Sequence, residues 1–272
     1  MTLRWVRAAS LAAVLAVLAA TGCGQGSGTG AGDAAAGQVI VRVAAAADLK
    51  FALEEVKTEL ARSQPDVGLA ITYGSSGTFF QQLSNGAPFD LYLSADLAYP
   101  ARLADAGKAR KDDVFPYAVG RLVVWAPRES PVDATQGLAA LSSREVTKVA
   151  IANPEHAPYG KAAVSAMQTA GVYERVKDKL VLGENVAQAA EFALSGNAQV
   201  GVFALSLAVS SQLKDKGRYA EVPLEAYPRI DQGGVVMADA AHPQAAHKVK
   251  DFLLGEQGRE ILTRYGFSRA HP

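Results

Sequence analysis

The stretch "ITYGSSGTFFQQL" (residues 71–83) changes from a strand pattern to a helix pattern within a few residues. Apolar and β-branched residues at its start are typical of a strand, and the apolar spacing at its end is typical of a helix. The junction, 74–78, holds only small residues, two of them adjacent serines. A strand that passes directly into a helix is the unit from which helix-covered parallel or mixed sheets are built.

The same order recurs along the rest of the chain. The pattern predicts strands at 39–47, 67–74, 89–96, 120–127, 148–154 and 229–239, and helices at 48–63, 160–171 and over most of 243–267. The segments 179–197 and 198–213 each read as strand, turn and helix. This alternation predicts an α/β protein, and about 230 folded residues are enough for two lobes, each a mixed sheet flanked by helices.

Composition limits the partners that this chain can attract by bulk charge. The 272 residues include 27 Lys and Arg and 27 Asp and Glu, so the formal net charge is zero. A neutral protein has no general attraction for nucleic acid or for an acidic membrane surface. Any anion that it binds must therefore be held by local groups.

The N-terminal segment reads as an export signal. Two arginines precede an apolar run at 8–20, which is too short for a comfortable bilayer span. The run ends near Cys23, the only cysteine, in a context that resembles a bacterial lipobox, although Ala20 stands where that motif prefers leucine. We expect 1–23 to be a lipoprotein signal peptide lipidated at Cys23, and 24–37 to be a flexible tether. The alternative is a plain secretory signal with an incidental cysteine.

The serine turn is a candidate anion site. Helix N-termini carry unpaired N–H groups and partial positive charge, and serine hydroxyls add donors without bulk. The alternative is an ordinary N-cap, which serine also favours. Three other stretches, 44–50, 153–161 and 183–189, likewise follow a strand and open a helix. Four such helix starts in one cleft would hold a small tetrahedral oxyanion with neutral donors.

These residues resemble the periplasmic molybdate-binding proteins of ABC importers. The resemblance rests on "VRVAAAADLKFAL", "YGSSGTFFQQLSNGAPFDLYLSAD", "NPEHAPYGKAA" and "ENVAQAAEFALSGNAQVGVF", and it covers about 39–267. It implies a type II solute-binding fold of two lobes joined by a two-crossover hinge, with lobe 1 at 38–118 and 227–272 and lobe 2 at 119–226. It also implies a monomer that is not an enzyme and has no cofactor. Such a protein closes on molybdate or tungstate, with molybdenum held only as the oxyanion, and delivers it to a membrane permease and its ATPase.

The family's ligand residues match several positions here. The serine that donates to the oxyanion matches Ser76, with Ser75 as its neighbour. The residue after the proline of "HAPYG" matches Tyr159, which would use its backbone N–H, its phenol or both. The valine of "GENVAQ" matches Val186, which acts only through its N–H. Some members have a tyrosine where this chain has Ala204, so Tyr159 is the candidate for the missing phenol.

Asp48 departs from the family, which places a neutral serine or asparagine at this turn. A carboxylate about 4 Å from an anion costs roughly 4 kcal/mol per pair of unit charges at an effective dielectric near 20. We favour an Asp48 that caps its own helix and turns away, leaving the N–H groups of Ala47 or Asp48 to bind. The alternatives are a protonated Asp48 that donates, or a ligand other than a simple dianion. Lys50 would offset the charge only if it left its expected exposed position.

The remaining polar residues favour structural roles. The histidines form no metal-binding spacing, so we interpret His156 as part of a loop, and Asp90 and Asp96 as turn or packing residues. One functional alternative is a binding protein for sulfate, phosphate or an organic anion. A second is a secreted hydrolase with Ser76 as nucleophile, although the sequence lacks G-x-S-x-G. A third is a lipoprotein that senses or scaffolds.

Overall fold

The computed structural model describes residues 37–270. The predicted signal peptide, Cys23 and all but the last residue of the predicted tether lie outside the described residues. Within 37–270, none of the helices combines the length and the apolar character that crossing a bilayer requires.

The first sheet is mixed, as predicted, and has the strand order β2-β1-β3-β10-β4. Strand β1 pairs in parallel with β2 and β3, whereas β10 runs antiparallel to β3 and β4. The bounds are β1 Val39–Ala46, β2 Val67–Gly74, β3 Leu91–Ser94, β4 Ala109–Gly120 and β10 Ile230–Met237.

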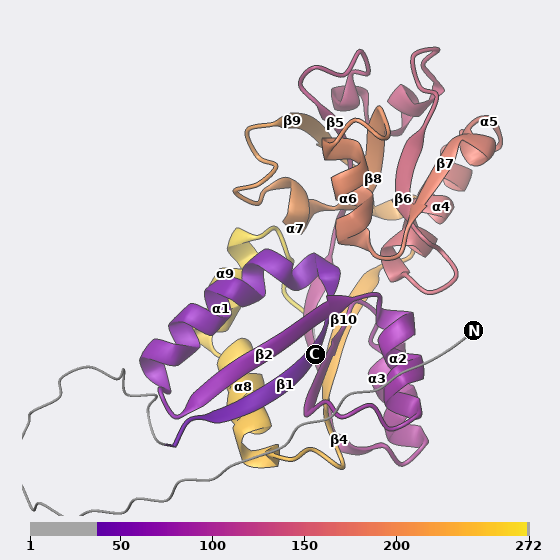
Figure 1. Cartoon of the computed structure of the whole chain (residues 1–272). Helices are drawn as coiled ribbons and strands as arrows, with labels where there is room; N and C mark the ends of the chain where they lie inside the picture. Colours follow the sequence, from indigo (N-terminus) through magenta and orange to yellow (C-terminus); the bar gives the residue numbers. More distant parts are fainter. Residues whose placement is uncertain (1–36, 271–272) are drawn as a thin grey trace, which may run out of the picture. The chain divides into compact units, whose positions relative to one another are not determined.

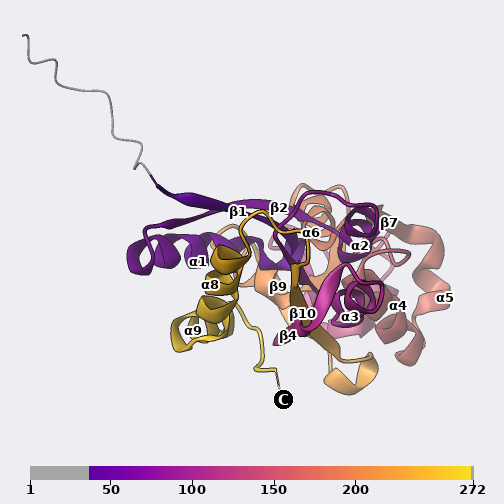
Figure 2. The same cartoon turned by 90° about the horizontal axis from the view of Figure 1, so that it is seen from below.

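Helices cover both faces of this sheet, and this sheet with its helices is the first lobe. Figure 1 shows α1, α8 and α9 on one face and α2 and α3 on the other, and Figure 2 shows the same separation from below. Two separate clusters of buried apolar side chains match the two faces. The bounds are α1 Lys50–Ser63, α2 Ser76–Ser84, α3 Ala98–Asp105, α8 Pro243–Leu254 and α9 Glu256–Arg264, with a 3₁₀ turn η1 at Ala47–Leu49.

The second sheet has the order β7-β6-β8-β5-β9 and forms the second lobe with its own helices. Strand β6 is parallel to β7 and β8, and β5 is antiparallel to β8 and β9. Its strands are β5 Leu122–Pro127, β6 Val149–Ala152, β7 Leu180–Gly183, β8 Val200–Ala204 and β9 Gly217–Glu221. Its helices are α4 Pro158–Thr169, α5 Tyr173–Val176, α6 Val186–Leu194 and α7 Leu205–Ala208, with 3₁₀ segments η2 Ala134–Ser142, η3 Lys177–Lys179 and η4 Leu224–Ala226. Both α4 and α6 pack on β6 and β8.

The chain crosses between the two sheets twice. It leaves the first sheet where β4 ends and enters the second at β5, with one residue between the two strands. It returns through 222–229, between β9 and β10. This confirms the α/β fold with two lobes and two crossovers, while the lobe boundaries given above stay a prediction.

Two strands have no clear signal in the sequence. After Ala109, strand β4 carries the charged run 110–113, three of whose four residues are exposed, and most of its buried residues lie in its second half. Strand β9 lies at the edge of its sheet and is mostly exposed, so it lacks the apolar alternation of a half-buried strand. Both strands form through pairing with a neighbour, which no local pattern reports.

Asp90 has a packing role in the first lobe, as predicted. Its buried carboxylate accepts hydrogen bonds from the backbone N–H groups of Arg42 and Ala241, both at 2.7 Å. Burial acts to raise the pKa of Asp90, but the hydrogen bonds from Arg42 and Ala241 outweigh it and hold the pKa below its usual value. The carboxylate thereby fixes β1 against the chain that follows β10.

Candidate functional site

One small cavity between the lobes brings the predicted site residues together. Its volume is about 10 Å³, close to the roughly 10–15 Å³ that one water molecule requires. Its walls come from the ends of β1 and β2, the loop after β3, and the starts of α2, α4 and α6. The lining residues are Ala46, Ala47, Asp48, Gly74, Ser75, Ser76, Ala95, Ala157, Pro158, Tyr159, Asn185 and Val186.

The hydroxyl oxygen of Ser76 already accepts a hydrogen bond within the protein. It is the first residue of α2 and is 1% exposed. Its Oγ accepts a hydrogen bond from the Ala95 N–H at 3.0 Å, and its carbonyl accepts one from the Tyr92 hydroxyl at 2.7 Å. These two bonds hold the residue in place, and the described residues offer its hydroxyl proton no acceptor. The proton is therefore available to an acceptor in the cavity.

Ser75 joins the two lobes instead of capping its helix. It occupies the N-cap position of α2 but makes no side-chain cap hydrogen bond. Its hydroxyl donates to the carbonyl oxygen of His156 at 2.6 Å, and the Gly77 N–H donates to the same oxygen at 2.8 Å. His156 Nδ1 lies 3.0 Å from the Ser75 Oγ. Ser75 therefore starts the helix without capping it through its side chain, and His156 contributes more than loop structure.

The start of α6 leaves one N–H group uncapped. Asn185 accepts hydrogen bonds from the N–H groups of Ala187 and Gln188, at 3.0 and 3.1 Å. The first N–H groups of a helix have no intrahelical acceptor. The cap therefore uses two of these groups and leaves that of Val186, on the cavity wall, for a ligand.

Asp48 does not cap the helix, so the favoured interpretation of this residue is wrong. It lies inside η1, where no side-chain cap hydrogen bond forms, and it is 1% exposed. Its Oδ2 accepts a hydrogen bond from Gln232 Nε2 at 2.5 Å. Burial raises the pKa of Asp48 to about 6, and hydrogen bonds from Gln232 and Tyr159 limit the rise. The carboxyl group is thus buried in the site with neutral partners.

The Tyr159 phenol is engaged by protein groups. Its oxygen accepts from Gln232 Nε2 at 3.1 Å, and its interaction with Asp48 adds to burial in raising the pKa of the phenol. The backbone N–H of Tyr159 lies in the first turn of α4, where helices leave N–H groups free. The geometry therefore favours the backbone over the phenol as its ligand group. Ala204 is buried in β8 and does not line the cavity.

Sequence reasoning missed two of the polar residues that organise the site. Gln232 is fully buried in β10 and bridges Asp48 and Tyr159. A signal was present, because a glutamine inside the buried strand pattern "RIDQGGVVMAD" requires hydrogen-bond partners. Asn185 was also identifiable, since asparagine directly before an apolar helical pattern is a common N-cap.

The geometry does not support a serine hydrolase. The histidine beside the serine turn, His156, contacts Ser75 and not Ser76. Ser75 donates its proton to the His156 backbone carbonyl, so the imidazole does not accept that proton here, although its Nδ1 lies 3.0 Å from the Ser75 Oγ. Within residues 37–270, no group of three or more His, Cys, Asp and Glu side chains could hold a metal ion.

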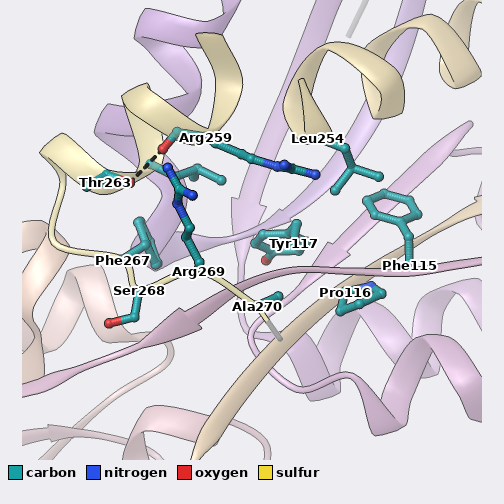
Figure 3. Close-up of a pocket in the computed structure, with 11 residues that line it drawn as sticks. Phe115, Pro116, Tyr117, Leu254, Arg259, Thr263, Phe267, Ser268, Arg269 and Ala270 are labelled. Atoms are coloured by element: carbon teal, nitrogen blue, oxygen red, sulfur yellow. Dashed lines mark hydrogen bonds between the residues drawn. The ribbon is translucent and has the colours of Figure 1, made fainter. Parts of the chain in front are cut away.

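A larger cavity of about 440 Å³ lies on the first lobe alone (Figure 3). Residues of β4, the end of α8, α9 and the C-terminal segment line it, among them the aromatic Phe115 and Phe267 and the arginines Arg259 and Arg269. None of the predicted site residues reaches it. Because a single lobe forms its walls, lobe closure does not enclose a ligand there.

The fold and the small cavity define a class of protein. Two lobes linked by two crossovers, with helix starts of both lining one small cavity, form a receptor that binds a small solute between its lobes. The chain belongs to the bacterial extracellular solute-binding proteins, whose family model matches residues 41–268. This family binds and transports solutes and is not a family of enzymes.

Named relatives narrow the comparison. The chain is 40% identical to the molybdate-binding protein ModA of Rhodobacter capsulatus, over 86% of this chain and 89% of the relative. It is 35% identical to ModA of Azotobacter vinelandii, over 84% of this chain and 89% of that protein. The solved structure of the Azotobacter vinelandii periplasmic molybdate-binding protein superposes with a TM-score of 0.80 at 28% identity, covering 85% of this chain and all of that one.

Proposed function

We propose that this protein binds molybdate, and also tungstate, in the cavity between its lobes and delivers it to an ABC importer. The proposal rests mainly on one observation. Ser76, Tyr159 and Val186 line the same cavity, to which they bring one hydroxyl and the N–H groups of two helix starts. Ala47, Asp48 and Ser75 complete the proposed set. The named relatives support molybdate over the other anions considered.

Neutral donors suit this ligand. A tetrahedral oxyanion presents acceptors in several directions, and the proposed donors come from both lobes. Hydrogen bonds to a charged group are about twice as strong as neutral ones, so a few N–H and O–H groups hold a dianion without a cation. Choice between oxyanions then follows from cavity size, because molybdate and tungstate are larger than sulfate.

Binding requires the lobes to separate and close again. The cavity is about the size of one water molecule, and groups of the first lobe are hydrogen-bonded to the His156 carbonyl of the second. An anion held by both lobes stabilises the closed arrangement over an open one, which is the differential contact that drives such a switch. We expect small-angle scattering to report compaction when the ligand saturates the protein.

The biological setting is part of the proposal. The family places the protein outside the cytoplasm, and we propose a lipid anchor at Cys23 followed by the flexible tether. The proposed partners are a membrane permease and its ATPase, with the binding protein acting as a monomer without enzymatic activity or a cofactor. Mass spectrometry of the protein purified from its host membrane tests the lipid at Cys23.

A ligand panel tests the function. Thermal unfolding of the protein is measured with molybdate, tungstate, sulfate and phosphate, each at the same concentration. A ligand present at 100 times its Kd stabilises the folded state by about 2.7 kcal/mol. We expect molybdate and tungstate to raise Tm and sulfate to leave it unchanged. A shift with sulfate or phosphate alone would reassign the ligand, and no shift with any of the four would overturn the proposal.

Replacement of Ser76 by alanine tests the site. The variant loses a hydroxyl donor to a charged ligand, which contributes about 2 kcal/mol, so we expect the Kd for molybdate to rise roughly 30-fold. Ser84→Ala is the matched control, because Ser84 lies at the other end of α2 and donates only to the Phe80 carbonyl. Calorimetric titration measures both. An unchanged Kd in Ser76→Ala would remove the hydroxyl from the binding site.

A further inference from the structure

Asp48 carries the one carboxyl group among the residues that line the cavity. Asp48 lines the same cavity as Ser76 and Tyr159, and its side chain is almost completely buried. One oxygen, Oδ2, accepts from Gln232, whereas the buried Oδ1 has no hydrogen-bond partner among residues 37–270. The buried Oε1 of Gln232 likewise has no hydrogen-bond partner among these residues. An unsatisfied acceptor of this kind requires an explanation.

Among residues 37–270, no cation pairs with this carboxyl group. The groups around it are Gln232 of β10, Tyr159 of α4 and Tyr117 of β4, and Ser206 of α7 donates to the Asp48 backbone carbonyl. Of these, only the two tyrosines titrate, and burial raises the pKa of both phenols, so they stay neutral. Lys50, the one neighbouring cation considered from the sequence, lies over the Phe51 ring.

An ionised Asp48 and a dianion in one small cavity would repel each other, with no positive charge among the described neighbours to offset the two. A single proton removes this repulsion and turns Oδ1 from an unsatisfied acceptor into a hydrogen-bond donor. The proton is readily obtained, because burial raises the pKa of Asp48 to about 6 before any anion arrives. At pH 7 the need to take up this proton makes the affinity for the anion only about tenfold lower than it would be if the carboxyl were already protonated.

We propose that the anion complex holds one proton between Asp48 Oδ1 and an oxygen of the anion, taken up from solvent when the anion binds. The inference rests on the proposed function and deepens it, since it makes Asp48 a pH-dependent determinant of affinity. The balance is simple: one proton leaves the solvent, the Asp48 carboxyl receives it, and no other bond is made or broken. Affinity is then constant below about pH 6 and falls about tenfold for each pH unit above it.

Calorimetry counts the proton. The full-length protein is titrated with sodium molybdate at pH 7.5 in two buffers of different ionisation enthalpy, and the Kd is measured from pH 5.5 to pH 8.5. Free molybdate is fully ionised above neutral pH, so a proton in the complex comes from solvent. We expect uptake of about one proton per anion and a Kd that rises about tenfold between pH 7.5 and pH 8.5.

Three variants separate this coupling from a structural role. Asp48→Asn and Asp48→Ser have neutral donors in place of the carboxyl, and each is expected to bind without proton uptake and with a flat pH profile. Two replacements are used so that misfolding of one does not remove the test. Asp96→Asn is the matched control, because Asp96 follows cavity residue Ala95 but does not line the cavity, and it should keep the proton uptake of the natural protein.

The outcomes are distinct. Binding of molybdate without proton uptake, or the same uptake in both Asp48 variants as in the natural protein, would overturn the inference and leave the proposed function standing. No binding of molybdate by the natural protein at any pH would overturn the proposed function and the inference with it. Tighter binding by Asp48→Asn than by the natural protein at pH 8.5 is the further result expected.

Discussion

Replacement of Gly77 by alanine is expected to weaken molybdate binding roughly 100-fold without unfolding either lobe. A Cβ atom at Gly77 would lie 2.6 Å from the carbonyl oxygen of His156 and 2.9 Å from its Cα. Both contacts are with backbone, which has no rotamer to change. Overpacking of this kind costs typically 1–3 kcal/mol. The clash exists only when the His156 loop of the second lobe rests on α2 of the first, so the whole cost falls on the closed state.

The opposite effect on folding makes the test specific. Alanine is the better helix former, by roughly 0.5–1 kcal/mol, so the unliganded variant should unfold at the same temperature as the natural protein or higher. Titration calorimetry gives the Kd, and scattering gives the extent of closure. Gln81→Ala, an exposed position on the same helix, is the control that should change neither. A normal Kd in Gly77→Ala would show that the His156 peptide does not rest on α2 in the bound state.

The sequence patterns predict the fold well because most of it is local. Buried strands such as β1 and helices such as α1 carry their period in consecutive residues, and the junctions between them carry small polar residues. Strands β4 and β9 are not predicted from the sequence. Exposed charged residues lie near the start of β4, and β9 pairs only at the edge of its sheet. Pairing with a distant strand leaves no trace in such a segment.

The site divides in the same way. The rule that helices begin at the carboxyl ends of strands predicts which turns meet, and the family resemblance singled out Ser76, Tyr159 and Val186 within those turns. The structure places all three on one cavity. The direction in which a side chain turns does not follow from that rule. Asp48 and Gln232 are 184 residues apart, so no local pattern shows that an amide of β10 holds the carboxyl. For the same reason the N-cap rule misassigned Asp48.

Replacement of Asp48 by asparagine is expected to stabilise the unliganded protein by about 3 kcal/mol at pH 7.5. The carboxyl has a pKa of about 6 when folded, against an ordinary value of 3.8. Each pKa unit corresponds to about 1.4 kcal/mol, so burial of the ionised form costs about 3 kcal/mol. Because the folded pKa is the higher one, the folded state binds more protons between these values. Stability is therefore greatest in acid, falls as pH rises from about 4 to 6, and is constant above.

Urea unfolding at pH 5 and pH 7.5 measures this effect. Between pH 5 and pH 7.5 the contribution of Asp48 to the free energy of unfolding of the natural protein should fall by about 1.4 kcal/mol. The Asp48→Asn variant should not show this fall. The hydrogen-bonded Asp66, Asp90 and Asp133 have lowered pKa values, so their contributions are lost only in stronger acid and do not enter the interval. Asp96→Asn should keep the slope of the natural protein. If Asp48→Asn is no more stable than the natural protein at pH 7.5, the carboxyl is not buried as an anion, and the repulsion that a bound oxyanion would meet is absent as well.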